Sequence, residues 1–335
     1  MSDNFVLSGS GLWTPDYSIS NQELVDSYNA YAEWHNERYA TEIEAGERPP
    51  KQLSSVSFVE KASGIKRRYV YCKDGILDIT RMRPNIPVRD DDELSHQGEI
   101  AVKAAKAALE DAQKAPSDID AVIVSCAYTQ RAYPAIAIEV QHALGINGFG
   151  FDMLVACSAA TFGMHRAFEM VKAGSAGAVL VINPELVSPQ LNYRDRDSHF
   201  IFGDVATATV IERESTASSH NAYDILSTKA LTQYSNTIRS NFGYMNYATD
   251  EAPYAADKLF HQEGRRVFKE VCPLAAQHIK EHLANHALTP QDLRRWWLHQ
   301  ANLNMNVLIS KRLLGRDATN DEAPIVLDEY ANTAS

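Results

Sequence analysis

Several features that would assign a function at once are missing from this sequence of 335 residues. No apolar run approaches the ~18 residues that a membrane-spanning helix needs. The N-terminus, MSDNFVLSGSG, has neither the basic segment nor the long apolar core of a signal peptide. The net charge of −11 argues against nucleic acid as the main partner. We therefore expect a cytoplasmic protein that binds neither membranes nor nucleic acids.

Cysteine is also scarce, and its spacing excludes two common site types. Cys72, Cys126, Cys157 and Cys272 include no CxxC pair and no Cys/His metal spacing, so we expect no bound metal. Without an export signal, they are expected to be free thiols. Residues 5–13 read as a strand that ends in the GxG of residues 9–11. This GxG lacks the third glycine of a dinucleotide-binding loop, so it predicts a tight turn and no nucleotide cofactor.

The remaining composition, 45% hydrophobic and 22% charged, is that of an ordinary globular enzyme. Chains beyond about 250–300 residues tend to divide, and strand-like and helix-like segments alternate in both halves of this one. That alternation predicts an α/β fold with largely parallel sheets. We expect two similar halves, residues 1–215 and 216–335. Polar stretches near 35–57 and 72–93 interrupt the first half and look like insertions.

The second half has its own predicted elements. A helix is expected over residues 264–286, a strand over the apolar segment 295–299, and a further helix over 301–315, where Leu308 and Leu313 share a face.

A cysteine in the first half occupies an unusual place. Cys157 lies in DMLVACSAATFG, residues 152–163, where an apolar strand gives way to a helix. A thiol at a helix N-terminus feels the positive end of the macrodipole, which lowers its pKa. The small neighbours leave room for a long substrate arm. From local context alone, a buried structural cysteine is the competing interpretation, although Cys126, inside an apolar strand, fits that description better.

Two residues in the second half have side chains that suit catalysis. His299, in WWLHQANLN, stands where the predicted strand meets a helix, and an imidazole there can act as acid, base or oxyanion donor. A hydrogen-bonded structural histidine is the alternative. Asn332, in EYANTAS, carries a neutral donor that suits a developing enolate oxygen. An asparagine in a loop indicates nothing by itself.

Taken together, VACSAATFG, HQANL and ANTAS resemble the motifs of the β-ketoacyl-acyl-carrier-protein synthase III family, in the thiolase superfamily. FGDVATA (202–208), GIKRR (64–68), VFKEV (267–271) and the GSGLWTP opening extend the resemblance over nearly the whole chain outside the two insertions. The resemblance implies a duplicated αβαβα fold with two mostly parallel mixed sheets, and a homodimer. It also implies that coenzyme A thioesters are substrates and that no cofactor is needed.

The resemblance assigns a role to each of the three residues. Cys157 would accept an acyl group from acyl-CoA. His299 and Asn332 would promote decarboxylation of malonyl-acyl-carrier protein and hold the enolate oxygen while the carbanion attacks the Cys157 thioester. The product would be a 3-oxoacyl-acyl-carrier protein of fatty acid biosynthesis. The two insertions resemble a longer branch of the family that uses medium-chain primers such as octanoyl-CoA.

Binding residues follow from the same resemblance. Arg196 corresponds to an arginine that contacts coenzyme A, and Trp34 to a tryptophan that stacks on adenine. Ala301 and Asn302 correspond to positions beside the pantetheine arm.

Three further positions concern protein partners. Tyr133 corresponds to an aromatic residue that the partner subunit lends to the acyl pocket. Lys311 and Arg312 correspond to basic positions that dock the acidic carrier protein, with a solvated helix face as the alternative.

The chain also departs from the family pattern. Close relatives carry an arginine where this chain has Asn304. The family continues for about 40 residues after its asparagine, including a glycine-rich strand that donates to the oxyanion hole. Two other functions stay open: a non-decarboxylating acyltransferase of the superfamily, or a catalytically silent acyl-binding partner subunit. Thiolases need a second catalytic cysteine near the C-terminus, and none follows Cys272; silent subunits usually lack the first cysteine.

Overall fold

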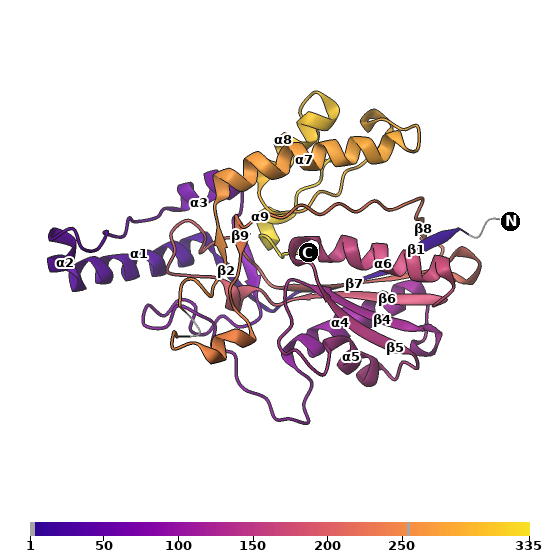
Figure 1. Ribbon diagram of the computed structural model, residues 1–335, viewed down its shortest axis with the longest axis horizontal. Coiled ribbons are helices and arrows are strands. Elements are labelled where there is room, and N and C mark those ends of the chain that lie inside the picture. The colour runs from indigo at the N-terminus through magenta and orange to yellow at the C-terminus, as the bar shows by residue number, and fades with distance from the viewer. Residues whose placement is uncertain (1–3, 253–254) are drawn as a thin grey trace.

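The computed structural model describes residues 4–252 and 255–335, and its centre is a six-stranded mixed sheet (Figure 1). The strand order is β5-β4-β6-β7-β1-β8. β4 pairs in parallel with both β5 and β6, and the other pairings are antiparallel. The strands are β1 (Phe5–Trp13), β4 (Ala121–Cys126), β5 (Phe149–Leu154), β6 (Ala178–Glu185), β7 (Val205–Arg213) and β8 (Tyr223–Asp224).

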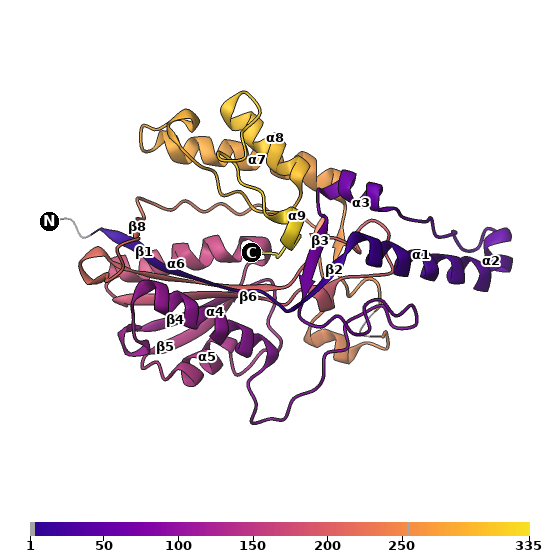
Figure 2. The same ribbon diagram turned by 180° about the vertical axis from the view of Figure 1, so that it is seen from behind.

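Helices cover both faces of this sheet because its central strands are apolar on both sides. Every residue of β4 and β6 is buried, so water must be excluded from both faces. α4 (His96–Ala112) and α5 (Ile136–Leu144) lie on one face, and α6 (Ala159–Ala173) lies on the other (Figures 1 and 2).

The expected strand over residues 5–13 is confirmed as β1, but the tight turn expected at its glycines is wrong. Gly9 and Gly11 lie inside β1, where α4 crosses it closely. A Cβ on Gly11 would lie 2.1 Å from Ala104 O, and one on Gly9 would lie 2.5 Å from Ala108 O. The glycines are therefore needed for helix-to-strand packing.

The first polar stretch is more ordered than the sequence suggests. α1 (Asn21–Arg38) begins at a capping box formed by Ser20 and Glu23. It continues into residues 35–57, where α2 (Ala40–Glu44) and the start of α3 (Val56–Ser63) also lie. Residues 72–93 contain no helix or strand, as expected for an excursion. β2 (Tyr17–Ser20) and β3 (Arg67–Val70) form a separate antiparallel pair beside these helices.

The second half consists mainly of two packed helices. α7 (Gly264–Ala284) and α8 (Leu303–Leu314) confirm the predicted helices to within two residues at each end. They enclose a small apolar cluster that includes Cys272, Trp296 and Leu313. The remaining elements are β9 (Ile238–Arg239), β10 (His261–Gln262), α9 (Leu327–Tyr330) and short 3-10 helices at Pro116–Asp118, Ala156–Ser158, Ser188–Gln190, Glu214–Thr216, Tyr244–Ala248 and Pro290–Asp292.

The strand predicted over residues 295–299 does not form. A strand needs a neighbouring strand that supplies backbone hydrogen bonds. Here the described backbone offers this segment one bond to a distant residue, from Trp296 N to Glu322 O at 2.7 Å. Over residues 4–252 and 255–335, the expected second sheet is represented only by the two-residue pairing of β9 with β10. Across the same residues, no helix combines the length and apolarity that crossing a bilayer requires.

Candidate active site

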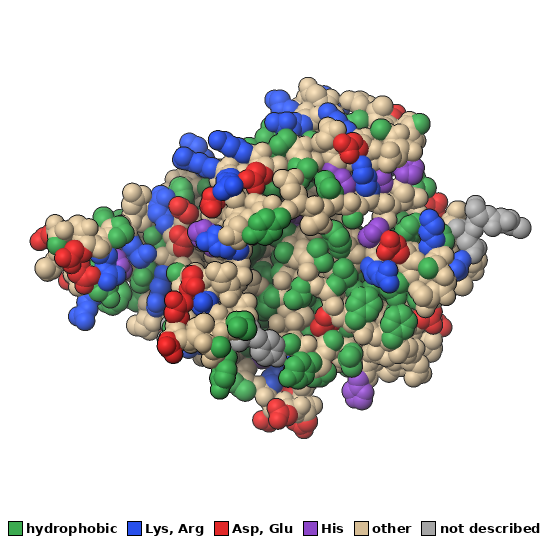
Figure 3. Space-filling model, viewed as in Figure 1, with side chains coloured by type: hydrophobic (Ala, Val, Ile, Leu, Met, Phe, Trp, Pro, Cys, Tyr) green, Lys and Arg blue, Asp and Glu red, His purple; other side chains and the backbone are tan. Residues whose placement is uncertain are grey.

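One cavity brings together the three residues that the sequence singles out. Cys157, His299 and Asn332 all line a space of about 840 Å³ between the end of β5, α3 and the C-terminal helices. In the view of Figure 3, hydrophobic side chains lie across the middle of the molecule, and Lys and Arg side chains lie along its upper edge. The apolar part of the lining is Phe58, Ala62, Phe200, Ile201, Phe202, Ile238, Phe260, Val267, Phe268, Val271 and Met305.

A sharp turn holds Cys157 at the wall of the cavity. β5 ends at Leu154, and α6 begins at Ala159. Between them, Ala156 has a φ of 46°, a left-handed conformation that costs a residue with a Cβ about 1–2 kcal/mol. Ser125 Oγ, on β4, donates to Ala159 O at 2.7 Å and ties the start of α6 to the sheet. Strain of this kind, held in place by surrounding structure, is a common feature of functional sites.

The acidity of Cys157 is the reverse of the expectation. Burial, with a smaller contribution from the nearby Glu185 carboxylate, raises the pKa of its thiol to about 11. The prediction that the helix N-terminus lowers this pKa is therefore wrong for the free protein, because desolvation is the larger effect. The thiol is protonated at neutral pH and must lose a proton before it attacks a thioester.

His299 reaches the cavity from an extended segment between α7 and α8. Its backbone oxygen accepts from Ala301 N at 3.0 Å. His299 is exposed to the cavity, yet desolvation by the protein atoms packed around its ring lowers the pKa of His299 to about 4. The imidazole is therefore neutral at neutral pH, with one N–H donor and one acceptor nitrogen. Within the described residues, no side chain hydrogen-bonds to this ring.

Asn332 is held by backbone on both sides. Its N–H donates to Ile201 O at 3.0 Å, and its backbone oxygen accepts from Gly203 N at 3.0 Å. Its side-chain Oδ1 accepts from Ala334 N at 2.9 Å. The amide is thus oriented with Oδ1 in use and the Nδ2 donors left for the cavity. Ala331 and Ala334 have φ values of 61° and 66°, so this turn is strained like the turn before Cys157.

Ala301 and Asn302 also line the cavity, and their place beside a pantetheine arm stays a prediction. The Asn302 side chain also has a structural role. Its Oδ1 accepts from Asn304 N at 2.8 Å and caps α8, and its Nδ2 donates to Ala62 O at 2.7 Å on α3. The side chain therefore fixes the segment that carries His299 to the first half of the chain.

Arg196 lies near the cavity, but Trp34 does not line it. The Arg196 guanidinium lies 3.8 Å from the centre of the Phe58 ring, and Phe58 is in the cavity wall. Trp34 lies on α1 in a separate pocket. Phe58 is an aromatic residue of the cavity wall that the sequence reasoning missed, because only the structure places it beside Arg196.

The residues assigned to protein partners lie on the surface. Tyr133 is 78% exposed before α5 and does not line the cavity. Lys311 and Arg312 are exposed on α8, and Lys311 forms an ion pair with Asp317 at 3.0 Å. Their roles stay predictions.

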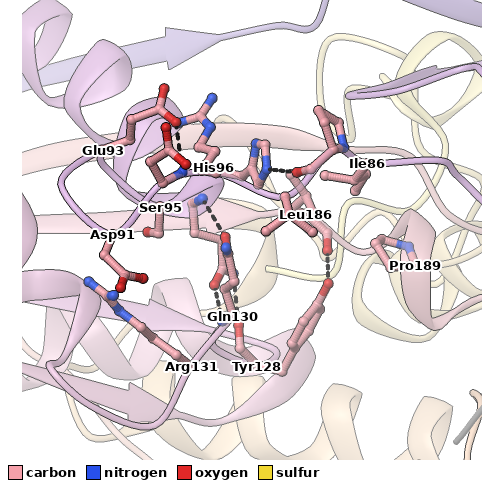
Figure 4. Close-up of a pocket in the computed structure, with 15 residues that line it drawn as sticks. Ile86, Asp91, Glu93, Ser95, His96, Tyr128, Gln130, Arg131, Leu186 and Pro189 are labelled. Atoms are coloured by element: carbon pink, nitrogen blue, oxygen red, sulfur yellow. Dashed lines mark hydrogen bonds between the residues drawn. The ribbon is translucent and has the colours of Figure 1, made fainter.

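A further pocket, of about 420 Å³, lies beside residues 86–97 at the start of α4 (Figure 4). Several of its polar groups already have partners in the protein. The ring of His96 forms two hydrogen bonds, from Nε2 to Pro87 O at 2.8 Å and between Nδ1 and Tyr71 OH at 2.8 Å. Arg131 forms an ion pair with Glu139. Few groups are free to bind a ligand there, so the Cys157 cavity is the better candidate.

Comparison with known proteins identifies the family. A profile described as 3-Oxoacyl-[acyl-carrier-protein (ACP)] synthase III matches residues 151–233. Over 311 residues the chain is 53% identical to beta-ketodecanoyl-[acyl-carrier-protein] synthase of Pseudomonas aeruginosa, covering 93% of this chain and 89% of that protein. The chain belongs to the 3-oxoacyl-[acyl-carrier-protein] synthase III family. It is also 33% identical over 244 residues to beta-ketoacyl-[acyl-carrier-protein] synthase III of Caldanaerobacter subterraneus, covering 71% of this chain and 70% of that one.

Solved structures agree with this on the fold. The 3-oxoacyl-[acyl-carrier-protein] synthase III of Aquifex aeolicus superposes with a TM-score of 0.74 at 21% identity, covering 98% of this chain and 86% of that one. The corresponding Pseudomonas aeruginosa enzyme gives a TM-score of 0.73 at 19% identity, covering 98% and 84%. The predicted thiolase-like α/β fold is confirmed.

Proposed function

We propose that this protein catalyses the decarboxylative Claisen condensation of an acyl-CoA primer with malonyl-acyl-carrier protein, giving 3-oxoacyl-acyl-carrier protein for fatty acid biosynthesis. The observation that carries the proposal is the convergence of Cys157, His299 and Asn332 on one cavity. Family membership supports the reaction class.

In the first half-reaction, Cys157 Sγ attacks the primer's thioester carbonyl. A bond forms from this sulfur to the acyl carbon, and the bond from that carbon to the coenzyme A sulfur breaks. Because the Cys157 thiol holds its proton at neutral pH, a base must accept it. The neutral imidazole of His299 has an acceptor nitrogen for that proton, and the departing coenzyme A thiolate takes it up.

In the second half-reaction, malonyl-acyl-carrier protein loses carbon dioxide as its C–C bond breaks. The electron pair forms an enolate, whose oxygen accepts hydrogen bonds from His299 and from Asn332 Nδ2. Neutral donors suit this step because they stabilise charge only as it appears on the oxygen. The carbanion then attacks the acyl carbon and a C–C bond forms as the bond from that carbon to Cys157 Sγ breaks. The Cys157 thiolate then takes a proton from water.

The primer is medium-chain in this proposal. The relative at 53% identity is named for a beta-ketodecanoyl product, and malonyl units add two carbons, so its name corresponds to an eight-carbon primer. By analogy, octanoyl-CoA is the primer proposed here. The aromatic and aliphatic lining of the cavity supports an alkyl substrate.

The finer features belong to the same proposal. Arg196 and Phe58 flank the coenzyme A entrance, Lys311 and Arg312 meet the carrier protein, and residues 1–215 and 216–335 act as the two halves. The protein works in the cytoplasm as a homodimer, in which Tyr133 reaches the partner's acyl pocket. The exposed edge strand β5, with Phe149 and Leu154 45% and 58% exposed, supports pairing with a second copy.

The competing functions have less support. Cys272 is fully buried between α7 and α8, so it does not supply a thiolase-type second cysteine to this cavity. A silent acyl-binding subunit has no need for the strained turn at Ala156 or for a neutral His299.

The reaction is tested by supplying malonyl-acyl-carrier protein with acetyl-, butyryl-, octanoyl- or lauroyl-CoA and measuring the 3-oxoacyl product by mass spectrometry. We expect the 3-oxoacyl product to form with the highest kcat/KM when octanoyl-CoA is the primer. Absence of condensation product with all four primers rejects the function. A maximum at acetyl-CoA rejects only the primer length.

A further inference from the structure

A buried carboxyl group near the catalytic residues has no part in the mechanism described above. Glu185 is the last residue of β6, and its exposed fraction is 0%. It does not line the Cys157 cavity, so it does not contact a substrate bound there. Burial of a charge without compensation is costly, and the contacts of Glu185 therefore show what the group can do.

One set of contacts connects Glu185 to the turn before the catalytic cysteine. Both carboxyl oxygens accept from Ala127 N at 3.1 Å. The residue before Ala127 is Cys126, whose backbone oxygen accepts from Val155 N at 3.4 Å. Val155 lies two residues before Cys157. The carboxyl group is thus held at the end of the sheet from which the catalytic sulfur projects.

A second contact connects Glu185 to the turn that carries Asn332. The Ser335 hydroxyl donates to a Glu185 carboxyl oxygen. In the same turn, Ala334 N donates to Asn332 Oδ1 at 2.9 Å. Glu185 therefore lies between the segments that position two of the three catalytic side chains.

No cation balances this carboxyl group. Across residues 4–252 and 255–335, Glu185 forms no ion pair. The ionisable groups whose charges act between them and Glu185 are Cys126 and Tyr128 at the end of β4, Asp204 before β7, and Cys157. All four are acids, so ionisation of any of them adds a like charge and opposes the ionisation of Glu185.

The protonation of Glu185 consequently changes near neutral pH. Burial, with a contribution from Asp204, raises the pKa of Glu185 to about 7, although its hydrogen bonds act in the opposite direction. Cys126 and Tyr128 have pKa values well above their ordinary ones, so both stay neutral there.

The groups on the cavity side of Cys157 differ from Glu185. His299 is neutral above its pKa of about 4, and the other charged residues of the lining are Asp197, Arg265 and Lys269. Glu185 is the neighbour of the sulfur whose charge changes near pH 7.

We propose that Glu185 is a positioning residue whose negative charge holds Cys157 in the thiol form, and whose protonation by solvent makes the Cys157 thiolate easier to form. This inference rests on the function proposed above, because Cys157 must become a thiolate to attack the primer and again when it leaves in the condensation. Ionised Glu185 opposes both events, and protonated Glu185 favours both.

The pH dependence of thiol reactivity tests the proposal without a thioester. Methyl methanethiosulfonate reacts with the Cys157 thiolate: an S–S bond to the methylthio group forms, and methanesulfinate leaves. The rate is measured at the Cys157 peptide from pH 5.5 to 9. In the wild type, we expect a rise of about tenfold per pH unit at both ends of this range, with a flatter stretch near pH 7, where Glu185 loses its proton. A straight profile through pH 7 overturns the proposal, whether or not any variant folds.

Glu185→Gln removes the charge and keeps the shape of the side chain. We expect the variant to match the wild type at pH 5.5, where Glu185 is protonated. At pH 9 it should react about tenfold faster, which corresponds to a change of about one unit in the pKa of Cys157, and its profile should have no flat stretch. A rate that changes by the same factor at both pH values shows a structural effect and overturns the proposal.

Glu212→Gln is the matched control. Glu212 is also a fully buried strand glutamate, but it lies at the opposite end of the sheet, where it pairs with Lys114 at 2.8 Å. Its profile should keep the flat stretch near pH 7, and loss of that stretch overturns the assignment to Glu185. A flat stretch in a protein that octanoyl-CoA does not acylate would support the role of Glu185 and reject the function on which this inference rests.

Discussion

The two halves of the chain hold their catalytic side chains in different ways. Cys157 follows a strand of a continuous sheet, and a hydrogen bond from Ser125 ties its helix to the next strand. His299 lies in an extended segment without sheet partners, fixed through the Asn302 cap to α3. The nucleophile is thus positioned by the core, whereas the acid–base group is positioned by a few polar contacts. Changes near His299 should therefore affect chemistry more than stability.

The largest effect is expected from His299→Ala. Loss of an oxyanion donor lowers rates by about 10²–10³-fold, so decarboxylation of malonyl-acyl-carrier protein should fall by that factor, measured as release of carbon dioxide. Thermal stability should stay close to wild type. Decarboxylation at the wild-type rate would remove His299 from the second half-reaction.

The pH dependence of decarboxylation tests the neutral state of His299. Its folded pKa of about 4 lies below the ordinary 6.5, so the ring should stay neutral as the pH falls through 6.5 and gain its proton only near 4. Below 6.5 the unfolded state binds this proton and the folded state does not, so His299 lowers the free energy of unfolding as the pH falls. Decarboxylation that follows a pKa near 6.5 would contradict a desolvated ring.

Asn332→Asp should give a smaller loss of condensation activity, because the new side chain has the same shape as asparagine. The new carboxylate keeps the acceptor for Ala334 N but removes the Nδ2 donor and places negative charge beside the enolate. We expect a drop of about 100-fold in condensation with acylation by octanoyl-CoA largely retained. Asn332→Ser, which can still donate, serves as the control and should lose less. Equal losses in the two variants would show that the donor is not what matters.

The thiol of Cys157 should react slowly at neutral pH. With a pKa of about 11, its thiolate fraction rises tenfold for each pH unit below that value. Alkylation by iodoacetamide, measured at the Cys157 peptide from pH 7 to 10, should increase accordingly. Cys157→Ala serves as the background for the other thiols. A rate that levels off near neutral pH would mean that the pKa of Cys157 is lowered, as its place at a helix N-terminus predicts.

The smallest effects are expected from variants of the contacts that position His299 and Cys157. Asn302→Ala removes a helix cap, worth about 1 kcal/mol of unfolding free energy, and releases the segment that carries His299. Ser125→Ala removes one buried hydrogen bond beside Cys157, also worth about 1 kcal/mol. At equal destabilisation, we expect Asn302→Ala to slow both half-reactions, because His299 acts in both, and Ser125→Ala to slow acylation alone. Slowed decarboxylation in Ser125→Ala, with unchanged decarboxylation in Asn302→Ala, would contradict this assignment of the two anchors.

What the sequence predicted well was local. The cysteine turn, the HQAN segment and the helices α7 and α8 carry their signals within a few residues, so motif and periodicity suffice. Gly9 and Gly11 were misread because their purpose is contact with α4, about a hundred residues away in the chain. The strand expected over 295–299 failed for a similar reason, since apolar residues make a strand only beside a partner.

Two further points concern the site itself. Trp34 was chosen by residue type and does not line the Cys157 cavity, whereas Phe58 lines it next to Arg196, so contact of Trp34 with coenzyme A stays a prediction. The acidity of Cys157 was judged from the helix end alone, but desolvation depends on everything packed around the sulfur. A short stretch of sequence shows neither the atoms that pack around the Cys157 sulfur nor the residues that lie next to Arg196 in space.

The account depends most directly on covalent acylation of Cys157. Intact-mass spectrometry after incubation with octanoyl-CoA should show one added octanoyl group on the wild-type protein and none on Cys157→Ala. His299→Ala should still be acylated, although more slowly. An unmodified wild-type protein, or an adduct that persists in Cys157→Ala, would contradict the central claim that this sulfur carries the acyl chain.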